Sequence, residues 1–138
     1  MPLIKKPSNI PPNISEKRIS LYTNINYPLF SFKYLSDASI KKCKDSKFFY
    51  NLIMRLQKLS DLGWEGIRTS QKHSFGLEKI PQKVIKPNSI LPKFITPEME
   101  LDVFRANGDN RALVGFQKDK IFCILFIEAK FGDIYNHK

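Results

Sequence analysis

The chain has 138 residues, enough for one domain of ordinary size with little room for a second. Hydrophobic residues make up 42% of it, with 11 Phe and 5 Tyr, so it can build a core and is not disordered throughout. The 23 Lys and Arg residues outnumber the 13 Asp and Glu residues, and the formal charge is +10. Such a charge favours a polyanionic partner (nucleic acid, acidic protein or anionic membrane), although a solvated basic surface without one is the alternative.

Cysteine usage points to a reducing compartment, and hydropathy indicates neither a membrane span nor a secretory signal. Cys43 and Cys123 lie far apart, and neither belongs to a CxxC pair or to a cluster with metal-ligand spacing. No apolar stretch approaches the roughly 20 residues that span a bilayer, and no apolar region follows Lys5 and Lys6 as it would in a secretory signal. We therefore expect a cytoplasmic protein that enters no membrane and uses no metal or other cofactor.

The N-terminal part predicts an arm followed by a strand. Residues 1–18 carry four prolines, which favour an extended arm, so the predicted domain covers residues 19–138. Between residues 19 and 35, aromatic and β-branched residues are frequent, and Phe30, Phe32 and Tyr34 alternate with polar residues. That two-residue period predicts a strand, which Pro28 interrupts or places at a sheet edge.

A helix is predicted over residues 47–62, capped by Asp45 or Ser46 and ended by Gly63. A shorter second helix is predicted over 64–71, with Trp64 in the core. Four prolines between residues 72 and 97 predict loops, with one short extended piece near 83–85. The apolar stripe of the first helix contains Phe48, Phe49, Leu52, Ile53, Leu56 and Leu59, whereas Arg55, Gln57 and Lys58 are expected to face solvent.

The final third predicts three strands joined by tight turns. They cover residues 99–106, 111–116 and 121–129, and the last is apolar enough to be the buried centre of a sheet. The polar sequences NGDN and QKDK lie between them. The predicted fold class is α+β: a mostly antiparallel sheet in β-α-α-β-β-β order with two helices on one face.

This last segment resembles the three-strand meander of the RelE/ParE-like toxins of bacterial toxin–antitoxin systems, mainly over residues 99–138. The matching features are a basic residue on the first strand, a Gly-Asp-x-Arg-like turn, an apolar third strand and a C-terminal tyrosine. The family commonly has a basic cluster directly after the third strand, where this chain has Glu128 and Ala129 before Lys130. The residues at the matching positions are Arg105, Gly108, Asp109, Arg111, the run 121–127 and Tyr135.

The resemblance implies a toxin that cleaves mRNA as an endoribonuclease without a metal. In such a reaction the 2′-hydroxyl of the RNA attacks the adjacent phosphorus while a base, cations and an acid assist. Arg105 and Arg111 are then the candidate phosphate clamps, and Lys130 would stabilise the same charge. In the alternative reading, the two arginines form salt bridges with Asp102, Asp109 or Glu128, and Lys130 ends the strand in solvent.

The remaining catalytic candidates lie after the third strand. Imidazole is the side chain best suited to exchange protons near neutral pH, so His137 is the candidate proton donor or acceptor, unless it belongs to a frayed tail. Tyr135 would stack on a base or carry a proton, or else pack on the core. Glu128 is a candidate general base or a structural partner of the cations. Candidate contacts to the nucleic-acid backbone are Arg68, Lys72, His73, Lys83, Lys86 and Lys118.

Two further hypotheses come from other classes. The chain is alternatively a non-catalytic basic binding protein, which either coats nucleic acid or inhibits DNA gyrase by protein contact, as ParE-like toxins do. A structural protein packed in an assembly is the third hypothesis. If the toxin hypothesis holds, the expected partners are RNA, including ribosome-bound mRNA, and an antitoxin protein with an acidic or amphipathic segment.

Overall fold

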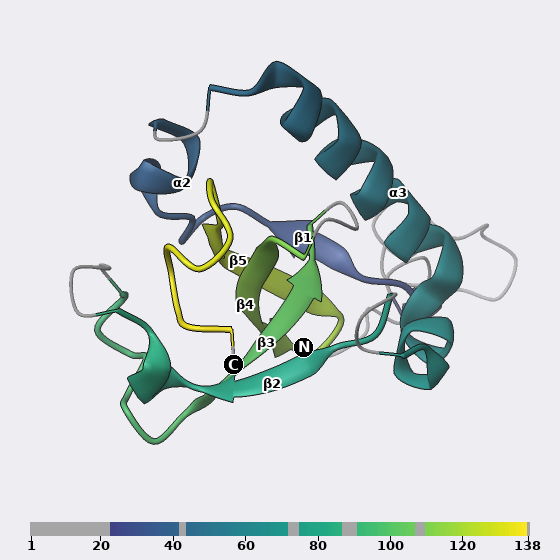
Figure 1. The fold of residues 1–138 in the computed structure, drawn as a ribbon. Coiled ribbons are helices and arrows are strands. Elements are labelled where there is room, and N and C mark those ends of the chain that lie inside the picture. Colours follow the sequence, from purple (N-terminus) through teal and green to yellow (C-terminus); the bar gives the residue numbers. More distant parts are fainter. Residues whose placement is uncertain (1–22, 42–43, 72–74, 87–90, 107–109, 138) are drawn as a thin grey trace, which may run out of the picture.

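The computed structural model describes residues 23–41, 44–71, 75–86, 91–106 and 110–137, so the predicted arm at 1–18 lies outside the described residues. Its core is a five-stranded sheet with α3 along one face (Figure 1). The strands are β1 (Leu29–Ser31), β2 (Glu78–Pro81), β3 (Glu100–Arg105), β4 (Ala112–Lys118) and β5 (Ile121–Ile127); the helices are α2 (Asp37–Lys41), α3 (Ser46–Thr69) and the short 3₁₀ helix η1 (Gln82–Val84).

The sheet has the strand order β1-β5-β4-β3-β2 and is antiparallel except where β1 runs parallel to β5. The predicted α+β class and mostly antiparallel sheet are therefore confirmed. The apolar strand β5 is an inner strand between β1 and β4, while β4 is the middle one. Within the described residues, no helix combines the length and apolar character needed to cross a membrane.

Three local features differ from the sequence prediction. The extended piece expected near 83–85 is η1, and the strand lies just before it as β2, which is an edge strand ending at Pro81. The first strand is only three residues long, because the chain turns after Ser31, whose hydroxyl accepts the Lys33 N–H. The five-residue helix α2 was not predicted; its Ser39 hydroxyl accepts the Ile127 N–H and so continues the edge of β5.

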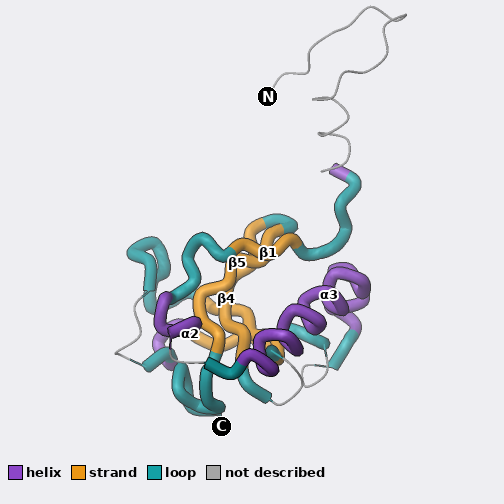
Figure 2. Tube along the Cα trace, turned by 90° about the horizontal axis from the view of Figure 1, so that it is seen from above, coloured by secondary structure: helices purple, strands orange, loops and turns teal. Residues whose placement is uncertain are grey.

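The long helix α3 consists of two helical segments that meet at Gly63, where φ is 71° and ψ is 170°. The predicted break at this glycine is thus confirmed, and the Asp45 carboxylate caps the first segment by accepting the Phe48 N–H at 3.1 Å. Both segments pack on the same face of the sheet (Figure 2). The predicted stripe is wrong at Ile53, whose side chain is 61% exposed, and Arg55 is partly buried rather than outward-facing.

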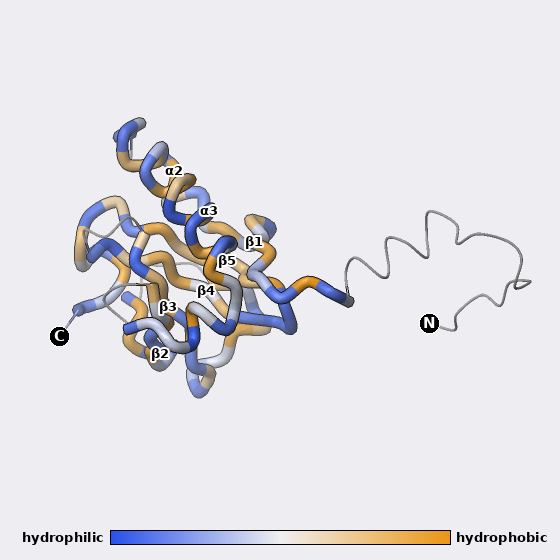
Figure 3. Tube along the Cα trace, turned by 90° about the vertical axis from the view of Figure 1, so that its right-hand side faces the viewer, coloured by the Kyte–Doolittle hydropathy of each residue, from blue (hydrophilic) through white to orange (hydrophobic). Residues whose placement is uncertain are grey.

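The sheet is buried on both faces. On one face the apolar side of α3 packs against Phe104, Leu113 and Phe122, with Trp64 at the margin of this core. On the other face a second core is built around Leu101, Val114, Phe126 and Tyr135 and is covered by loops rather than helices. Hydrophobic residues run along the inner strands, whereas β2 at the edge is pale or hydrophilic (Figure 3). The second face is where the C-terminal segment returns to the sheet.

Candidate functional site

Five side chains gather on the second face, at the end of the sheet where β5 finishes. We call Glu78, Arg105, Glu128, Tyr135 and His137 the charge cluster. Glu78 begins β2, Arg105 ends β3, and Glu128 directly follows β5. The C-terminal segment, yellow in Figure 1, runs back past these strand ends. It is held there by a β-bridge between Ile85 and Tyr135 and by a Lys86 N–H bond to the Ile134 carbonyl.

Arg105 is the centre of the charge cluster. One guanidinium nitrogen donates to Glu78 Oε1 at 2.7 Å, and the other donates to the Asn110 carbonyl and lies 3.2 Å from His137 Nδ1. Only 5% of the Arg105 side chain is exposed, against 25% of the Glu78 side chain. Solvent therefore reaches this ion pair from the Glu78 side. A guanidinium has donors only, and His137 Nδ1 must therefore accept the hydrogen bond from Arg105.

That requirement fixes the tautomer of His137. With Nδ1 accepting, the ring proton is on Nε2, which donates to Glu128 Oε1 at 2.8 Å. Glu128 is fully buried and also accepts the backbone N–H groups of Ala112, Gly132 and Ile134. Four donors thus saturate this carboxylate, which makes Glu128 an anchor for the tail and for the His137 ring.

The His137 ring lies between two aromatic rings. Tyr135 stacks on one side with ring centroids 4.1 Å apart, and Phe131 lies on the other at 4.0 Å. Tyr135 packs into the second core, and burial raises the pKa of its phenol to about 12 although the nearby Arg105 charge opposes that shift. Its hydroxyl has no hydrogen-bond partner of suitable geometry among the described residues. It is therefore a protonated, unused donor near neutral pH.

The other two predicted catalytic residues lie apart from the charge cluster. The Arg111 guanidinium lies 3.7 Å from the centroid of the Phe48 ring, on the α3 face, and donates to the Ala129 carbonyl. Arg105 pairs with Ala112 across β3 and β4, so these two residues share a face, and Arg111, one residue before Ala112, points to the other. Lys130 is exposed. Of the acidic partners considered for the arginines, Asp102 instead pairs with Lys79 at 2.6 Å, and Asp109 lies outside the described residues, as does Gly108.

The candidate backbone-binding residues are spread over the molecule. Lys83 and Lys86 are exposed near the C-terminal segment, and Lys86 Nζ donates to the Gly132 carbonyl. Lys118 is exposed at the opposite end of β4, and Arg68, near the end of α3, pairs with Glu65 at 2.8 Å. Lys72 and His73 lie outside the described residues.

Sequence reasoning missed two residues, Glu78 and Phe131. Glu78 was missed because its short edge strand was not predicted, and only the register opposite Val103 brings it beside Arg105. Phe131 is 54% exposed and covers His137. An aromatic residue in the otherwise polar turn KFGD was a usable signal for it.

The described residues contain no group of three or more His, Cys, Asp or Glu side chains placed to hold a metal ion. Comparison of the chain with protein-family models, with curated proteins and with solved structures found no match. The family assignment therefore stays an inference from the residues quoted above.

Proposed function

We propose that the protein is a RelE/ParE-like toxin that cleaves RNA without a metal and that the charge cluster is its active site. The observation that carries the proposal is the environment of Arg105. Its guanidinium bonds to a carboxylate, Glu78, on one side and contacts an imidazole, His137, on the other. A cation between a candidate base and a candidate acid is the set of groups that attack by a 2′-hydroxyl on phosphorus requires.

In the proposed reaction a phosphate approaches from the Glu78 side and replaces the Glu78 carboxylate as the partner of the Arg105 guanidinium. The released Glu78 accepts the proton of the 2′-hydroxyl, whose oxygen attacks phosphorus while Arg105 stabilises the developing charge. The move of Arg105 also frees His137 Nδ1 to bind a proton from water, and this proton passes to the 5′-oxygen as the P–O5′ bond breaks. Glu78 returns the proton of the 2′-hydroxyl to water after the product leaves. The products are a 2′,3′-cyclic phosphate and a 5′-hydroxyl end.

The neighbouring residues then have supporting roles. Glu128, saturated by four donors, is a positioning residue that orients His137 and not the general base. The unused Tyr135 hydroxyl supplies a hydrogen bond to a phosphate oxygen. The exposed Phe131 ring offers a surface on which a base stacks. An acidic or amphipathic antitoxin segment covering Glu78 and Phe131 would block entry to the site.

One observation favours the non-catalytic alternative. Arg105, Glu128 and Tyr135 are nearly closed to solvent, Arg105 forms an ion pair with Glu78, and Glu128 accepts a hydrogen bond from His137. The same contacts would serve equally to tie the C-terminal segment to the sheet in a basic protein that binds nucleic acid or gyrase. The two functions differ in what happens when Glu78 loses its charge, since only the ribonuclease needs a base.

The test is expression in bacteria with growth followed and cellular RNA 5′ ends mapped, for the unaltered chain, Glu78→Gln, His137→Gln and Arg111→Ala. Lys58→Ala, at an exposed position of α3 outside the candidate site, is the control for loss of one surface charge. We expect growth arrest with new 5′-hydroxyl ends, reduced about 100-fold or more by Glu78→Gln and His137→Gln. Arg111→Ala should weaken cleavage less, because its side chain lies on the α3 face.

Each other outcome has a defined meaning. Growth arrest without new RNA ends would support gyrase as the target. Cleavage that survives Glu78→Gln at full rate would remove the assigned base, and cleavage lost only in Arg111→Ala would move the active site to the α3 face. If the chain causes neither growth arrest nor cleavage, the hypothesis that remains is a basic binding protein. Circular dichroism of each purified variant separates loss of chemistry from loss of fold.

A further inference from the structure

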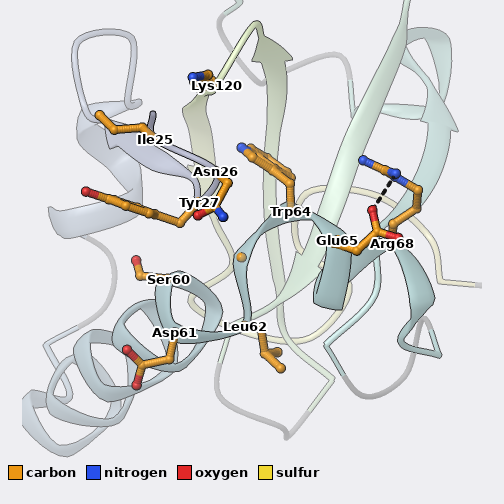
Figure 4. A pocket seen from close by; sticks show the side chains of 11 residues that line it. Ile25, Asn26, Tyr27, Ser60, Asp61, Leu62, Trp64, Glu65, Arg68 and Lys120 are labelled. Atoms are coloured by element: carbon orange, nitrogen blue, oxygen red, sulfur yellow. Dashed lines mark hydrogen bonds and ion pairs between the residues drawn. The ribbon is translucent and has the colours of Figure 1, made fainter. Parts of the chain in front are cut away.

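We propose that the pocket at the Gly63 break of α3 binds one nucleotide of single-stranded RNA, with its base against Trp64 and Tyr27. The proposal takes RNA as the ligand from the proposed function but concerns a second site. The pocket has a volume of about 640 Å³ and lies between the segment before β1 and α3 (Figure 4). Volumes of this size are typical of small-ligand sites.

The break in α3 creates this pocket. Gly63 takes a positive φ, which turns the chain so that the Trp64 N–H bonds to the Asn26 carbonyl at 2.9 Å. The bond joins α3 to the segment that leads into β1, and the side chains of Asn26 and Tyr27 come to line the pocket together with Trp64. The shape of the pocket is thus set by a backbone contact between α3 and the segment before β1.

Trp64 carries an unused donor in this pocket. The indole packs against the first core, yet its Nε1–H is buried and has no acceptor among the described residues. A buried donor without a partner costs about 1–3 kcal/mol, and tryptophan N–H groups usually find an acceptor. The nitrogen-bearing edge of the ring is turned toward the side on which Asn26 and Lys120 lie (Figure 4). Because less than 1 Å² of this nitrogen is exposed, a ligand with a ring carbonyl or ring nitrogen would satisfy the donor after the indole turns toward the pocket.

The remaining lining residues narrow the ligand class. Tyr27 is 39% exposed and offers an aromatic face, and the Asn26 amide supplies both a donor and an acceptor. Arg68, which forms an exposed ion pair with Glu65, and Lys120, whose Nζ donates to the Thr23 carbonyl, bring two cations to the pocket. Asp61 and Glu65 bring two carboxylates to the same lining. A flat ring with acceptors at its edge meets the aromatic faces and the amide, and its phosphate would lie beside Lys120, on the side away from Asp61 (Figure 4).

The pocket lies far from the charge cluster. Lys120 is in the β4–β5 turn, whereas the Ala112 N–H at the other end of β4 bonds to Glu128. Seven strand residues separate these ends, which is about 20 Å at roughly 3.3 Å per residue. A strand of RNA held in the pocket would therefore be cleaved some nucleotides away, and the pocket should govern affinity rather than the chemical step.

Trp64 is the single tryptophan of the chain and reports directly on its own pocket. The experiment titrates the full chain with each of four ribonucleoside monophosphates and with a 2′-O-methyl oligonucleotide, which cannot be cleaved, and records tryptophan fluorescence. We expect saturable quenching by the oligonucleotide and by at least one nucleotide. Tyr27→Ala and Lys120→Ala should each weaken binding about tenfold. Tyr50→Ala removes a tyrosine that is 66% exposed and lies outside the pocket, and it should change nothing.

Trp64→Phe removes the donor and the signal together, so its affinity is measured by anisotropy of a dye-labelled oligonucleotide, and it should also bind about tenfold more weakly. The proposal is overturned if no ligand quenches Trp64 saturably, or if Tyr27→Ala and Lys120→Ala leave the quenching curve unchanged. Cleavage of unmodified RNA is assayed separately. Cleavage without binding at Trp64 overturns this pocket alone, whereas saturable binding without cleavage supports the pocket and overturns the ribonuclease.

Discussion

His137 Nε2 lies 2.8 Å from Glu128 Oε1, and this contact ties the C-terminal segment to the residue that follows β5. The same carboxylate accepts three backbone N–H groups, one of them from the first residue of β4. A single buried charge therefore organises the end of the sheet, the turn after it and the tail. It also holds the imidazole against Arg105.

Glu128→Gln should lower the free energy of unfolding by about 3 kcal/mol, because an amide nitrogen would then face backbone donors that a carboxylate now satisfies. Urea denaturation measures the change. Glu98→Gln, at an exposed turn position, is the matched control and should stay within about 0.5 kcal/mol of the unaltered chain. Equal midpoints for the two variants would contradict the anchoring role.

Stability should fall as the pH rises from about 10 toward 12, because folded Tyr135 has a pKa of about 12 against 10.0 for an unperturbed phenol. Between these two pH values the folded state keeps a proton that the unfolded chain releases. The contribution of this proton to the free energy of unfolding is therefore fully present below pH 10 and is lost as the pH rises toward 12. Tyr135→Phe should remove this loss, which is on the order of 2 kcal/mol. Tyr50→Phe, an exposed position, should keep it in the same pH series of urea curves.

Gly63→Ala should destabilise the protein more than Gly132→Ala does. Both glycines have a positive φ, so both variants carry the backbone strain of about 1–2 kcal/mol. A Cβ at residue 63 would also lie 3.1 Å from the Asn26 carbonyl, whereas one at residue 132 meets nothing within 4 Å. Thermal unfolding compares the two variants. An equal loss of stability would mean that the Asn26 carbonyl moves aside without a cost in free energy.

Asp45→Ala should cost about 1 kcal/mol, because it removes the carboxylate that accepts the Phe48 N–H at the start of α3. Asp45→Asn retains an acceptor oxygen and should recover most of the loss. The sequence alone left Ser46 as the alternative cap, and Ser46→Ala tests it within the same helix turn. A larger effect of Ser46→Ala in denaturant unfolding would reverse the assignment.

Much of the fold was predictable because local sequence patterns determine it. The apolar stripe of residues 48–59, the stop at Gly63 and the three C-terminal strands all follow from residue period and turn chemistry. The errors lie where local preference is weak. The strand β2 has one buried residue, Ile80, and forms because β3 offers an edge to pair with.

The candidate site likewise has residues that the sequence predicted and one that only the tertiary structure brought in. Sequence alone selected Arg105, Glu128, Tyr135 and His137 from their residue types and from the family resemblance, and they do lie together. Sequence alone also selected Arg111, which lies on the other face because Arg105 pairs with Ala112 and Arg111 directly precedes that residue. The partner of Arg105 was decided by the tertiary structure, since Glu78 is 27 residues away and strand register alone joins them. Local chemistry is encoded residue by residue, whereas contacts between distant residues depend on pairing that only the folded chain makes.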